Sequence, residues 1–317
     1  MKEFIINKNE ENQRLDKYLK KLLPNASTSF LYKMMRKKNI VINKKKVTGN
    51  EKLVEGDVVQ LFFCDETFDK FHIDLEALKA EYEAYKTYDL KRLSIIYEDD
   101  EMILMNKPYN MLSQKASEKD ISANEYLLAY MIKKGELSFE VFQTFHPSVV
   151  NRLDRNTTGL LLFGKTLSAL QTLGEGVRER KIQKYYRAIV HGELTQSLHL
   201  KGYLLKDEAA NKVVYYETKV EGAVYIETDV KPLLSQNGLT LIEVHLITGK
   251  THQIRLHLSS IGHPIIGDMK YGDAKVNKQY YESHKVKHQL LHAYALKFSD
   301  GREFIAQPEK IYDIIMQ

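Results

Sequence analysis

The first 64 residues carry apolar positions first at helical and then at strand spacing. Leucines and one tyrosine recur at helical spacing over residues 15–23, and Pro24 ends that helix. Ser27 is suited to begin a second helix, because its hydroxyl can accept a bond from a free backbone amide. Asn39 is expected to take the left-handed conformation that ends this second helix. Strand-like runs follow, at residues 40–42 and 58–63. The pattern predicts a small module in which two helices precede the strands.

Residues 94–317 contain more strand-like runs than helix-like runs. The strand-like runs are residues 94–97, 102–105, 185–190, 224–230, 241–246 and 293–298, and the helix-like runs are 122–134, 168–180 and 251–261. Several strands follow one another with no helix between them, which is not the pattern of a doubly wound parallel sheet. We therefore predict an α+β fold with a mixed, largely antiparallel β-sheet, preceded by the small α/β module.

The segment between these two regions is expected to be a linker that is partly helical. Four of its apolar side chains have helical spacing, namely Leu75, Leu78, Tyr82 and Tyr85. We therefore divide the chain into a small N-terminal domain at residues 1–64, a linker at residues 65–93 and a large domain at residues 94–317.

Composition places the chain among ordinary globular proteins. Of its 317 residues, 43% are hydrophobic and 28% are charged, which excludes disordered, collagen-like and low-complexity classes. The single cysteine, Cys64, excludes an internal disulfide framework and fits a reducing compartment. The N-terminus has no apolar stretch long enough for a signal peptide, and the apolar run at residues 159–163 is far too short to cross a bilayer. We expect a soluble, cytoplasmic, monomeric protein with no membrane partner.

Charge is distributed unevenly along the chain. The formal net charge is +5, but residues 1–64 alone hold 14 basic and 7 acidic residues, so the remainder carries a small acidic excess. Between residues 31 and 46 there are seven basic residues and no acidic ones. These residues, called the basic face below, are Lys33, Arg36, Lys37, Lys38, Lys44, Lys45 and Lys46. Such a face can neutralise phosphates and release counterions, so a polyanion partner is expected.

This segment resembles the small S-four-type RNA-binding domain first described in a ribosomal protein. The similarity rests on three runs, at residues 14–19, 35–43 and 54–58. The family usually has glycine where this chain has Asn39 and Lys44. Lys44 adds charge at the turn that is expected through Asn43 and Lys44, after the strand at residues 40–42. The resemblance implies that the basic face binds RNA.

Residues 151–163 join a charge-dense turn to an apolar run. Asp154 lies between Arg152 and Arg155, and arginine neighbours favour the ionised form of a carboxylate. An ionised carboxylate can act as a nucleophile or as a base. An aspartate in an ion-paired turn is also a common structural feature, and the local residues alone favour this structural interpretation.

Two further stretches contain polar side chains that can carry chemistry. A helix beginning near Thr251 places Arg255 one turn in, where its guanidinium can pair with a carboxylate or hold a phosphate. Alternation along the strand at residues 185–190 puts Lys184 and Tyr186 on the same face. Tyr186 can stack on a base, although an ordinary strand tyrosine is the simpler interpretation in a chain with 20 tyrosines.

Taken together, these stretches resemble the RluA class of RNA pseudouridine synthases. The similarity extends from about Ile95 to Pro308, nearly the whole large domain. The matching runs are residues 96–100, 106–108, 152–154, 157–161, 184–192, 248–272 and 291–293, of which 106–108 is expected to be structural. An S-four-type domain ahead of the large domain is also the arrangement of many members. The resemblance implies an enzyme that isomerises specific uridines to pseudouridine in structured RNA.

The resemblance also implies a role for individual residues. Asp154 would be the catalytic carboxylate, and Arg255 would pair with it and hold it. Tyr186 would pack against the target uracil. Arg152 would fill the gap that the extruded uridine leaves in the RNA stack, or contact the RNA backbone. Asn151 stands where many members have histidine, at a position expected to contact RNA.

The implied reaction requires neither a redox cofactor nor a metal. Uridine becomes pseudouridine when the bond from base to sugar breaks and the base turns and rejoins through carbon 5, with no atoms gained or lost. A carboxylate can attack the anomeric carbon or abstract the 2′ proton toward a glycal, and the sequence leaves both routes open. The base must also leave the helix stack, at a cost of a few kcal/mol that RNA contacts offset. Ribosomal RNA is the first expected substrate and transfer RNA the second.

Two other interpretations stay open. The chain would be a catalytically silent RNA-binding or ribosome-assembly protein on the same scaffold, although the joint presence of Asp154, Tyr186 and Arg255 favours the enzyme. A metal-dependent RNA hydrolase would instead use three histidines spaced to line one helix face, His284, His288 and His292. No metal is expected, because no His-Glu-x-x-His pattern lies near them.

Overall fold

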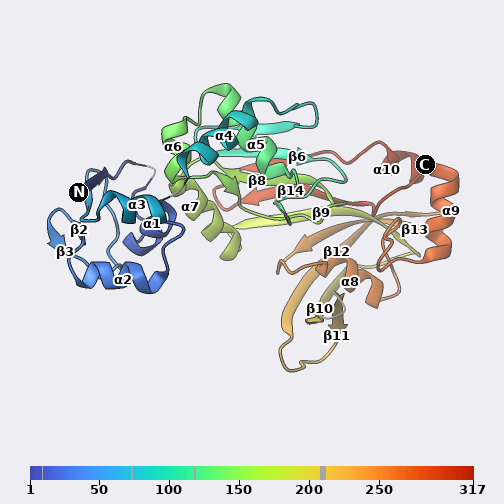
Figure 1. Ribbon diagram of the computed structural model, residues 1–317. Coiled ribbons are helices and arrows are strands. Elements are labelled where there is room, and N and C mark those ends of the chain that lie inside the picture. The colour runs from blue at the N-terminus through green and yellow to red at the C-terminus, as the bar shows by residue number, and fades with distance from the viewer. Residues whose placement is uncertain (9, 73, 118, 208–211) are drawn as a thin grey trace. The chain divides into compact units, whose positions relative to one another are not determined.

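The computed structural model describes residues 1–8, 10–72, 74–117, 119–207 and 212–317. These residues form two compact units. The first unit comprises Met1–Leu90, Glu125–Ser148 and Gly164–Thr172, and the second comprises Lys91–Asn124, Val149–Phe163 and Leu173–Gln317. Figure 1 shows their helices and strands, most of them labelled.

The N-terminal part of the first unit is a small antiparallel sheet covered by two helices. The strand order in the described residues is β1, β4, β2, β3, at Lys2–Ile5, Val58–Leu61, Ile40–Ile42 and Lys45–Lys46. Helices α1 (Leu15–Leu22) and α2 (Thr28–Arg36) bury their apolar positions in the same core as the strands, as the helical spacing predicts. The prediction for Ser27 is confirmed, because its hydroxyl accepts a hydrogen bond from the backbone amide of Phe30.

The end of α2 differs from the prediction for Asn39. Lys38 takes the left-handed conformation, with φ of 59°, one residue earlier than expected. The Lys38 amide donates to the carbonyl of Met35, and the Asn39 amide donates to the carbonyl of Met34. This pair of bonds defines a Schellman ending, in which the residue before the second donor must be left-handed. The expectation for Asn39 was wrong because the helix stops one residue before the apolar pattern indicates.

The turn after β2 follows the sequence prediction. Asn43 and Lys44 both have positive φ, of 50° and 64°. A two-residue hairpin loop whose twist matches its strands needs positive φ at both positions, and asparagine tolerates it well. The turn is therefore built by these two residues even though neither is glycine.

The segment that follows the N-terminal core is helical and packed. The helices from residue 65 to residue 178 are α3 at Asp65–Phe71, α4 at Leu75–Lys86, α5 at Ala123–Lys134, α6 at Phe139–Thr144 and α7 at Leu167–Arg178. The helix predicted within residues 65–93 is α4. Its Tyr82 ring packs against Phe139 and Phe142 of α6, and the Tyr82 hydroxyl donates to the carbonyl of Leu137. This segment therefore contributes apolar contacts to the first unit.

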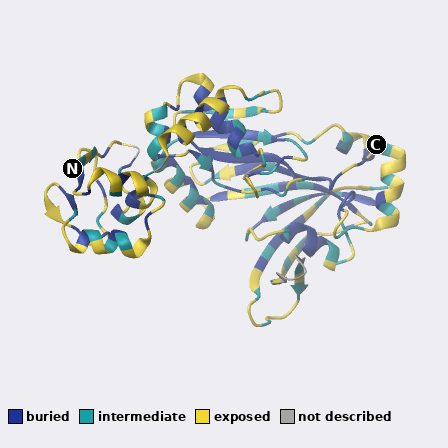
Figure 2. Cartoon of the chain, viewed as in Figure 1, coloured by how far each residue is buried: buried dark blue, intermediate teal, exposed yellow. Residues whose placement is uncertain are grey.

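The second unit is built on a mixed, largely antiparallel sheet, which confirms the predicted fold class. In the described residues its eleven strands follow the order β11-β10-β12-β13-β9-β14-β8-β6-β5, with β15 beside β14 and β7 beside β8. Pairing is antiparallel from β11 through to β14, whereas β14 and β8 run parallel. Figure 2 shows buried residues running along the strands in the middle of this sheet.

The strand bounds show which strands the sequence predicted. They are β5 at Ile95–Glu98, β6 at Met102–Lys107, β7 at Ser148–Val149, β8 at Thr158–Gly164, β9 at Ile182–His191, β10 at Leu198–Asp207, β11 at Lys212–Tyr216, β12 at Val224–Gln236, β13 at Leu239–Leu246, β14 at Leu291–Phe298 and β15 at Glu303–Ile305. The strand-like runs of the sequence correspond to β5, β6, β9, β12, β13 and β14. Strands β7, β8, β10, β11 and β15 were not among the predicted strands, and in β10 the apolar positions are interrupted by lysine and glycine.

Helix α8 (Gln253–Ser260) lies against β12 and begins two residues later than expected. His252 has φ of 57°, which no helical residue adopts, so the helix can start only at Gln253. The side-chain amide of Gln253 donates from Nε2 to the Thr228 hydroxyl of β12 at 2.8 Å. Helix α10 (Ile311–Ile315) shares another hydrophobic cluster with Ile189 of β9, and α9 spans Ala274–His284. No helix among the described residues is long and apolar enough to cross a membrane.

Candidate active site

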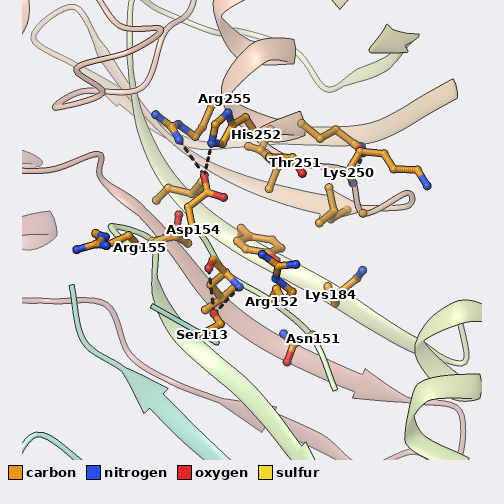
Figure 3. Close-up of a pocket in the computed structure, with 18 of the residues that line it drawn as sticks. Ser113, Asn151, Arg152, Asp154, Arg155, Lys184, Lys250, Thr251, His252 and Arg255 are labelled. Carbon is orange, nitrogen blue, oxygen red and sulfur yellow. Dashed lines mark hydrogen bonds and ion pairs between the residues drawn. The ribbon is translucent and has the colours of Figure 1, made fainter. Parts of the chain in front are cut away.

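A pocket of about 560 Å³ opens on the sheet of the second unit. It is lined mainly by the loop that precedes β8, by β9 and by the segment that leads into α8. Figure 3 shows Asp154 in this pocket, with the side chains of Arg255 and His252 directed at it. The lining also includes Arg152, Asn151 and Tyr186, so the structure brings together the residues singled out in the sequence of the large domain.

The loop that carries Asp154 is fixed by backbone bonds on both sides. The hydroxyl of Ser113 donates to the carbonyl of Leu153 and accepts from the Leu153 amide, both at 2.9 Å. The Thr157 amide donates to the carbonyl of Asp154, which closes the turn. Gly159 follows with φ of 106°, and a Cβ there would lie 2.3 Å from the carbonyl oxygen of Ala293 in β14. Only glycine therefore lets the chain leave this turn and pair closely with β14.

Lys107 at the end of β6 holds the same loop from inside the protein. Its side chain is fully buried, and its ammonium donates to the carbonyls of Pro108, Met111 and Arg155. Burial lowers the pKa of Lys107 to about 7, and the negative charge of Asp154 opposes this effect. The structural role expected for residues 106–108 therefore consists of tying two loops together beneath the pocket.

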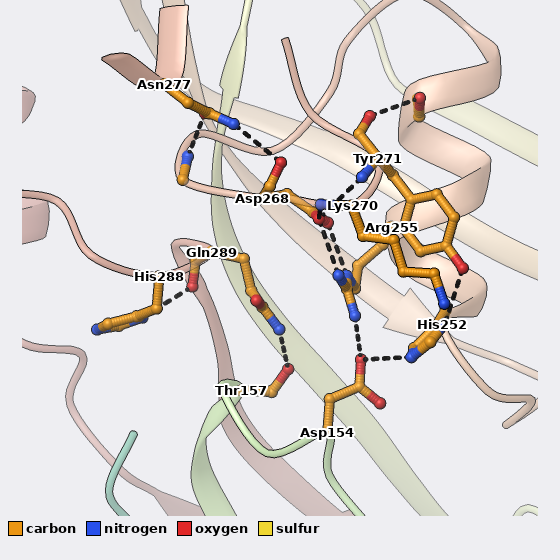
Figure 4. Close-up of polar contacts among 12 residues, drawn as sticks. Asp154, Thr157, His252, Arg255, Asp268, Lys270, Tyr271, Asn277, His288 and Gln289 are labelled. Atoms are coloured by element: carbon orange, nitrogen blue, oxygen red, sulfur yellow. Dashed lines mark hydrogen bonds and ion pairs between the residues drawn. The ribbon is translucent and has the colours of Figure 1, made fainter. Parts of the chain in front are cut away.

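Asp154 is the outer end of a chain of three charged side chains. Arg255 donates from Nη1 to Oδ2 of Asp154 at 2.8 Å. The opposite edge of the same guanidinium binds Asp268 with two bonds, from Nε at 2.6 Å and from Nη2 at 2.8 Å. Figure 4 shows Asp268 also accepting bonds from the backbone amides of Lys270 and Tyr271. Arg255 thus has no rotational freedom left, and it presents one N–H to Asp154 in a fixed direction.

Burial and ion pairing shift the pKa values of the inner two residues of this chain in opposite directions. Asp268 is 1% exposed and Arg255 is 8% exposed. Burial alone would lower the pKa of Arg255, but its bonds to Asp268 and to Asp154 raise it above its usual value. Burial would likewise raise the pKa of Asp268, and the bonded guanidinium of Arg255 lowers it instead. Both inner partners therefore stay charged, and Asp154 is the carboxylate of the chain that lines the pocket.

Tyr186 forms part of the pocket wall beside Asp154. It lies on β9, opposite Val244 of β13 and Ala293 of β14, and is 5% exposed. Burial, and secondarily the charge of Asp154, raises the pKa of its phenol above the usual value, so the ring is neutral. Lys184 lines the same pocket, as alternation along the strand predicts.

His252, Asp268 and Tyr271 were not assigned a role from the sequence. The His252 Nε2 atom lies 3.8 Å from Oδ2 of Asp154, and its Nδ1 atom is hydrogen-bonded to the Tyr271 hydroxyl at 2.8 Å. Burial lowers the pKa of His252, which favours the neutral ring at pH 7. The Tyr271 ring also covers the Arg255 guanidinium, 5.0 Å from its centroid. The sequence contains one signal for Asp268, which is an acidic residue in a turn bounded by two glycines.

The side chain of Asn151 is held in place by hydrogen bonds to the protein backbone. It is buried, its amide oxygen accepts from the backbone amide of Leu162 at 2.8 Å, and its amide nitrogen donates to the carbonyl of Leu160 at 3.4 Å. These bonds tie the loop to β8. Contact of this side chain with RNA stays a prediction, whereas the neighbouring Arg152 and Arg155 are exposed at the pocket.

The basic face lies in the first unit, on α2 and on the β2–β3 hairpin. All seven residues are exposed. None of them forms an ion pair with a carboxylate in the parts of the chain that the structure describes. Their positive charge is therefore open to solvent, which suits nonspecific contact with phosphates.

The three histidines with a spacing of four do not share a helix face. Helix α9 ends at His284, His288 follows in a loop, and His292 lies in β14. Both ring nitrogens of His292 have partners, the hydroxyl of Thr158 at 2.7 Å and the carbonyl of Ala306 at 2.9 Å. The expected helical alignment is wrong, because the chain leaves the helix after its first histidine.

The charge of the pocket indicates an anionic ligand. Five basic side chains line it, namely Arg152, Arg155, Lys184, Lys250 and Arg255. Asp154 is the one carboxylate among the described lining residues. A single oriented carboxylate in a basic, partly apolar pocket can act on a neutral group that is attached to a phosphate backbone.

Comparison with known proteins agrees with this geometry. The family described as RNA pseudouridylate synthase matches residues 101–260, and the S4 domain matches residues 13–59. The chain is 33% identical over 294 residues to the ribosomal large subunit pseudouridine synthase C of Vibrio vulnificus, covering 93% of this chain and 87% of the relative. It is 30% identical over 318 residues to an uncharacterized RNA pseudouridine synthase of Mycoplasma capricolum, covering 98% of this chain and 99% of the relative.

Solved structures show the same fold at lower identity. Human RNA pseudouridylate synthase domain containing 4 superposes with a TM-score of 0.56 at 22% identity, over 74% of this chain and 95% of that one. Human RNA pseudouridylate synthase domain containing 1 gives a TM-score of 0.54 at 19% identity, over 70% and 86%. The chain belongs to the RNA pseudouridylate synthases, enzymes that isomerise uridine to pseudouridine in RNA, and it carries an S4 domain ahead of the catalytic region.

Proposed function

We propose that this chain converts specific uridines of ribosomal RNA to pseudouridine with Asp154 as the catalytic carboxylate. The observation that carries the proposal is the chain from Asp268 through Arg255 to Asp154, which ends at a basic pocket. A carboxylate held by a fixed guanidinium is positioned before the substrate arrives, and such positioning lowers the barrier of the chemical step.

The chemistry assigns each pocket residue a task. The bond from C1′ to N1 of uridine breaks, the base rotates, and a bond from C1′ to C5 forms, while C5 loses a proton and N1 gains one. Asp154 either attacks C1′ or removes the 2′ proton to give a glycal, and both routes need the same oriented oxygen. Arg255 holds that oxygen, Tyr186 packs against the uracil, and Arg152 occupies the gap in the RNA stack or contacts the backbone. Asn151 keeps the loop in place and completes the RNA-facing wall.

The N-terminal domain supplies affinity for RNA. Its basic face would contact phosphates, with the domain at residues 1–64, the linker at 65–93 and the catalytic domain at 94–317. Ribosomal RNA is supported by the relatives named for the large ribosomal subunit, and transfer RNA is the second candidate. A monomer that acts without metal in the cytoplasm, where ribosomal RNA is found, fits this proposal.

Mapping of pseudouridine in total RNA tests the proposal directly. Cells with and without this gene are compared by carbodiimide-stop sequencing, and the deletion strain is complemented with the wild-type gene or with Asp154→Asn. We expect one or a few ribosomal RNA sites to be lost on deletion, restored by the wild type and not restored by the variant. The variant should bind RNA within a few-fold of the wild type, because it keeps the shape of the side chain.

The outcomes separate the parts of the proposal. Restoration by Asp154→Asn would remove Asp154 from catalysis. Lost sites in transfer RNA alone would change the substrate and keep the chemistry. Loss of no site, together with no turnover on candidate RNAs in vitro, would leave a silent RNA-binding protein.

A further inference from the structure

Lys184 is a charged residue of the pocket to which the reaction assigns no task. It lies on β9, two residues before Tyr186 and on the same face of the strand. Residues with this spacing are about 6.6 Å apart along a strand. A nucleotide whose base packs on Tyr186 would therefore extend its sugar and phosphate within reach of the Lys184 side chain.

The ammonium of Lys184 is half-buried and has no partner. Among the described residues, no carboxylate or carbonyl accepts a hydrogen bond from it, and Figure 3 shows no interaction drawn to it. Burial lowers the pKa of Lys184, and no neighbouring negative charge opposes that effect. By contrast, the guanidinium of Arg255 makes three hydrogen bonds to carboxylates. A charge withdrawn from water without a partner is costly, so a ligand anion would satisfy it.

Gly249 keeps space open for this ammonium. A Cβ at Gly249 would lie 2.9 Å from Nζ of Lys184, and Gly249 is not in a left-handed conformation that would itself require glycine. Glycine at position 249 therefore leaves room for the ammonium of Lys184, and its backbone conformation does not itself require glycine. The exposed Gly249 leaves this head group accessible from the pocket opening.

We propose that Lys184 binds a phosphate of the target nucleotide, and so positions the extruded uridine between Tyr186 and Asp154. This proposal rests on the function proposed above, because it takes the pocket to be the uridine site. Uracil and ribose are neutral, so the flanking phosphates are the only anionic groups that an RNA chain can offer to Lys184. Lys184 is a positioning residue on this view and takes no part in the proton transfers.

The experiment compares uridine with uridine 5′-monophosphate and uridine 3′-monophosphate as ligands. Binding to the full-length protein is measured by NMR titration, which also quantifies millimolar affinities. The proteins are the wild type, Lys184→Met, Gly249→Ala and the control Lys231→Met. Lys231 is an exposed strand lysine on β12 that does not line the pocket.

We expect the wild type to bind one of the two monophosphates at least about tenfold more tightly than uridine, as is usual for a hydrogen bond to a charged group. Lys184→Met should lose this preference, Lys231→Met should keep it, and affinity for uridine should be unchanged in all. The monophosphate that shows the effect identifies the phosphate concerned. Gly249→Ala should reduce the preference by crowding Nζ, which serves as the test if Lys184→Met does not fold.

Two results would overturn the proposal. Equal binding of uridine and both monophosphates by the wild type would show that the pocket reads no phosphate. A preference retained by both Lys184→Met and Gly249→Ala would assign phosphate binding to another side chain. A preference that depends on Lys184 in a protein that modifies no RNA would instead contradict the proposed function and keep this site.

Discussion

Charged side chains are organised in opposite ways in the pocket of the second unit and on the basic face of the first. In the pocket, Asp268, Arg255 and Asp154 bind one another in sequence, and the inner two are almost fully buried. On the basic face, the seven lysine and arginine side chains are exposed and have no carboxylate partner among the described residues. One region fixes the direction of a single carboxylate, while the other offers charge without a fixed direction.

The difference shows which property each task needs. Catalysis depends on the position of an oxygen atom to within a fraction of an ångström, so its supporting side chains must be locked. Affinity for a polyanion depends on the number of phosphates neutralised, which long mobile lysines provide at little cost. Substitutions should therefore change the rate in one region and the salt dependence of binding in the other.

The largest effect on rate is expected where the locked chain is cut behind Asp154, the proposed catalytic residue. Asp268→Asn removes the buried charge that holds Arg255, without touching the substrate. We expect kcat to fall by about 10²-fold while KM changes little, because Arg255 can turn away from Asp154. The free energy of unfolding should fall by roughly 3 kcal/mol, because a buried guanidinium loses its charged partner. Steady-state kinetics and urea denaturation measure the two quantities.

Asp300→Asn is the matched control for this prediction. Asp300 is an exposed carboxylate that pairs with Arg302 in a turn, so the variant makes the same chemical change outside the pocket. Its kcat and stability should stay close to the wild type. Unchanged kcat in Asp268→Asn would mean that Arg255 is held well enough by Asp154 and Tyr271 alone.

The sequence predicted the catalytic region better than the residues that support it. Apolar patterning located α1, α2, α5 and most strands of the large sheet, because the apolar side chains of these elements are largely buried. Arg255 and Asp154 were paired only through the family resemblance, since 101 residues separate them. Asp268, His252 and Lys107 act through contacts that form only after folding, and local pattern cannot assign such contacts.

The errors in local structure have the same origin. Asn39 was expected to end α2, and Lys38 does so because backbone hydrogen bonds decide where a helix stops. The late start of α8 follows from the left-handed His252, whose ring points at Asp154 and Tyr271. Local propensity is overridden where tertiary contacts at the site fix the backbone.

On the basic face, an effect on RNA binding is expected in place of an effect on rate. Replacing Lys37, Lys38, Lys44 and Lys45 by glutamine should weaken RNA binding and flatten its dependence on salt by a slope of up to roughly 3. The kcat at saturating RNA should not change, because none of the four lines the pocket. Filter binding from low to high salt measures the slope.

The control makes an equal change of charge elsewhere. Four exposed lysines at or just after α9 are replaced together by glutamine, namely Lys275, Lys278, Lys285 and Lys287. If both sets flatten the slope equally, net charge and not the basic face determines binding. If neither does, the N-terminal domain makes no phosphate contacts.

The last effect concerns acid stability and leaves the rate aside, and it separates the same two regions. Burial lowers the pKa of His257 in α8 and of His292 in β14 to about 4, whereas residues 1–64 contain no histidine. Between pH 6.5 and pH 4 these two histidines bind protons in the unfolded chain but stay neutral in the folded protein. The free energy of opening should therefore fall as the pH falls through this window, by up to about 3 kcal/mol for each histidine.

Hydrogen exchange at pH 7 and pH 5, corrected for intrinsic rates and read by mass spectrometry, resolves the regions within the full-length protein. Peptides from α8 and β14 should lose protection at pH 5, and peptides from residues 1–64 should not. His257→Gln should shrink the change in α8, because the amide can still bond to Thr228 but does not titrate. An equal loss of protection in both regions would show that acid acts through carboxylates shared by the whole chain. In that case the buried histidines would not distinguish the catalytic region from the N-terminal domain.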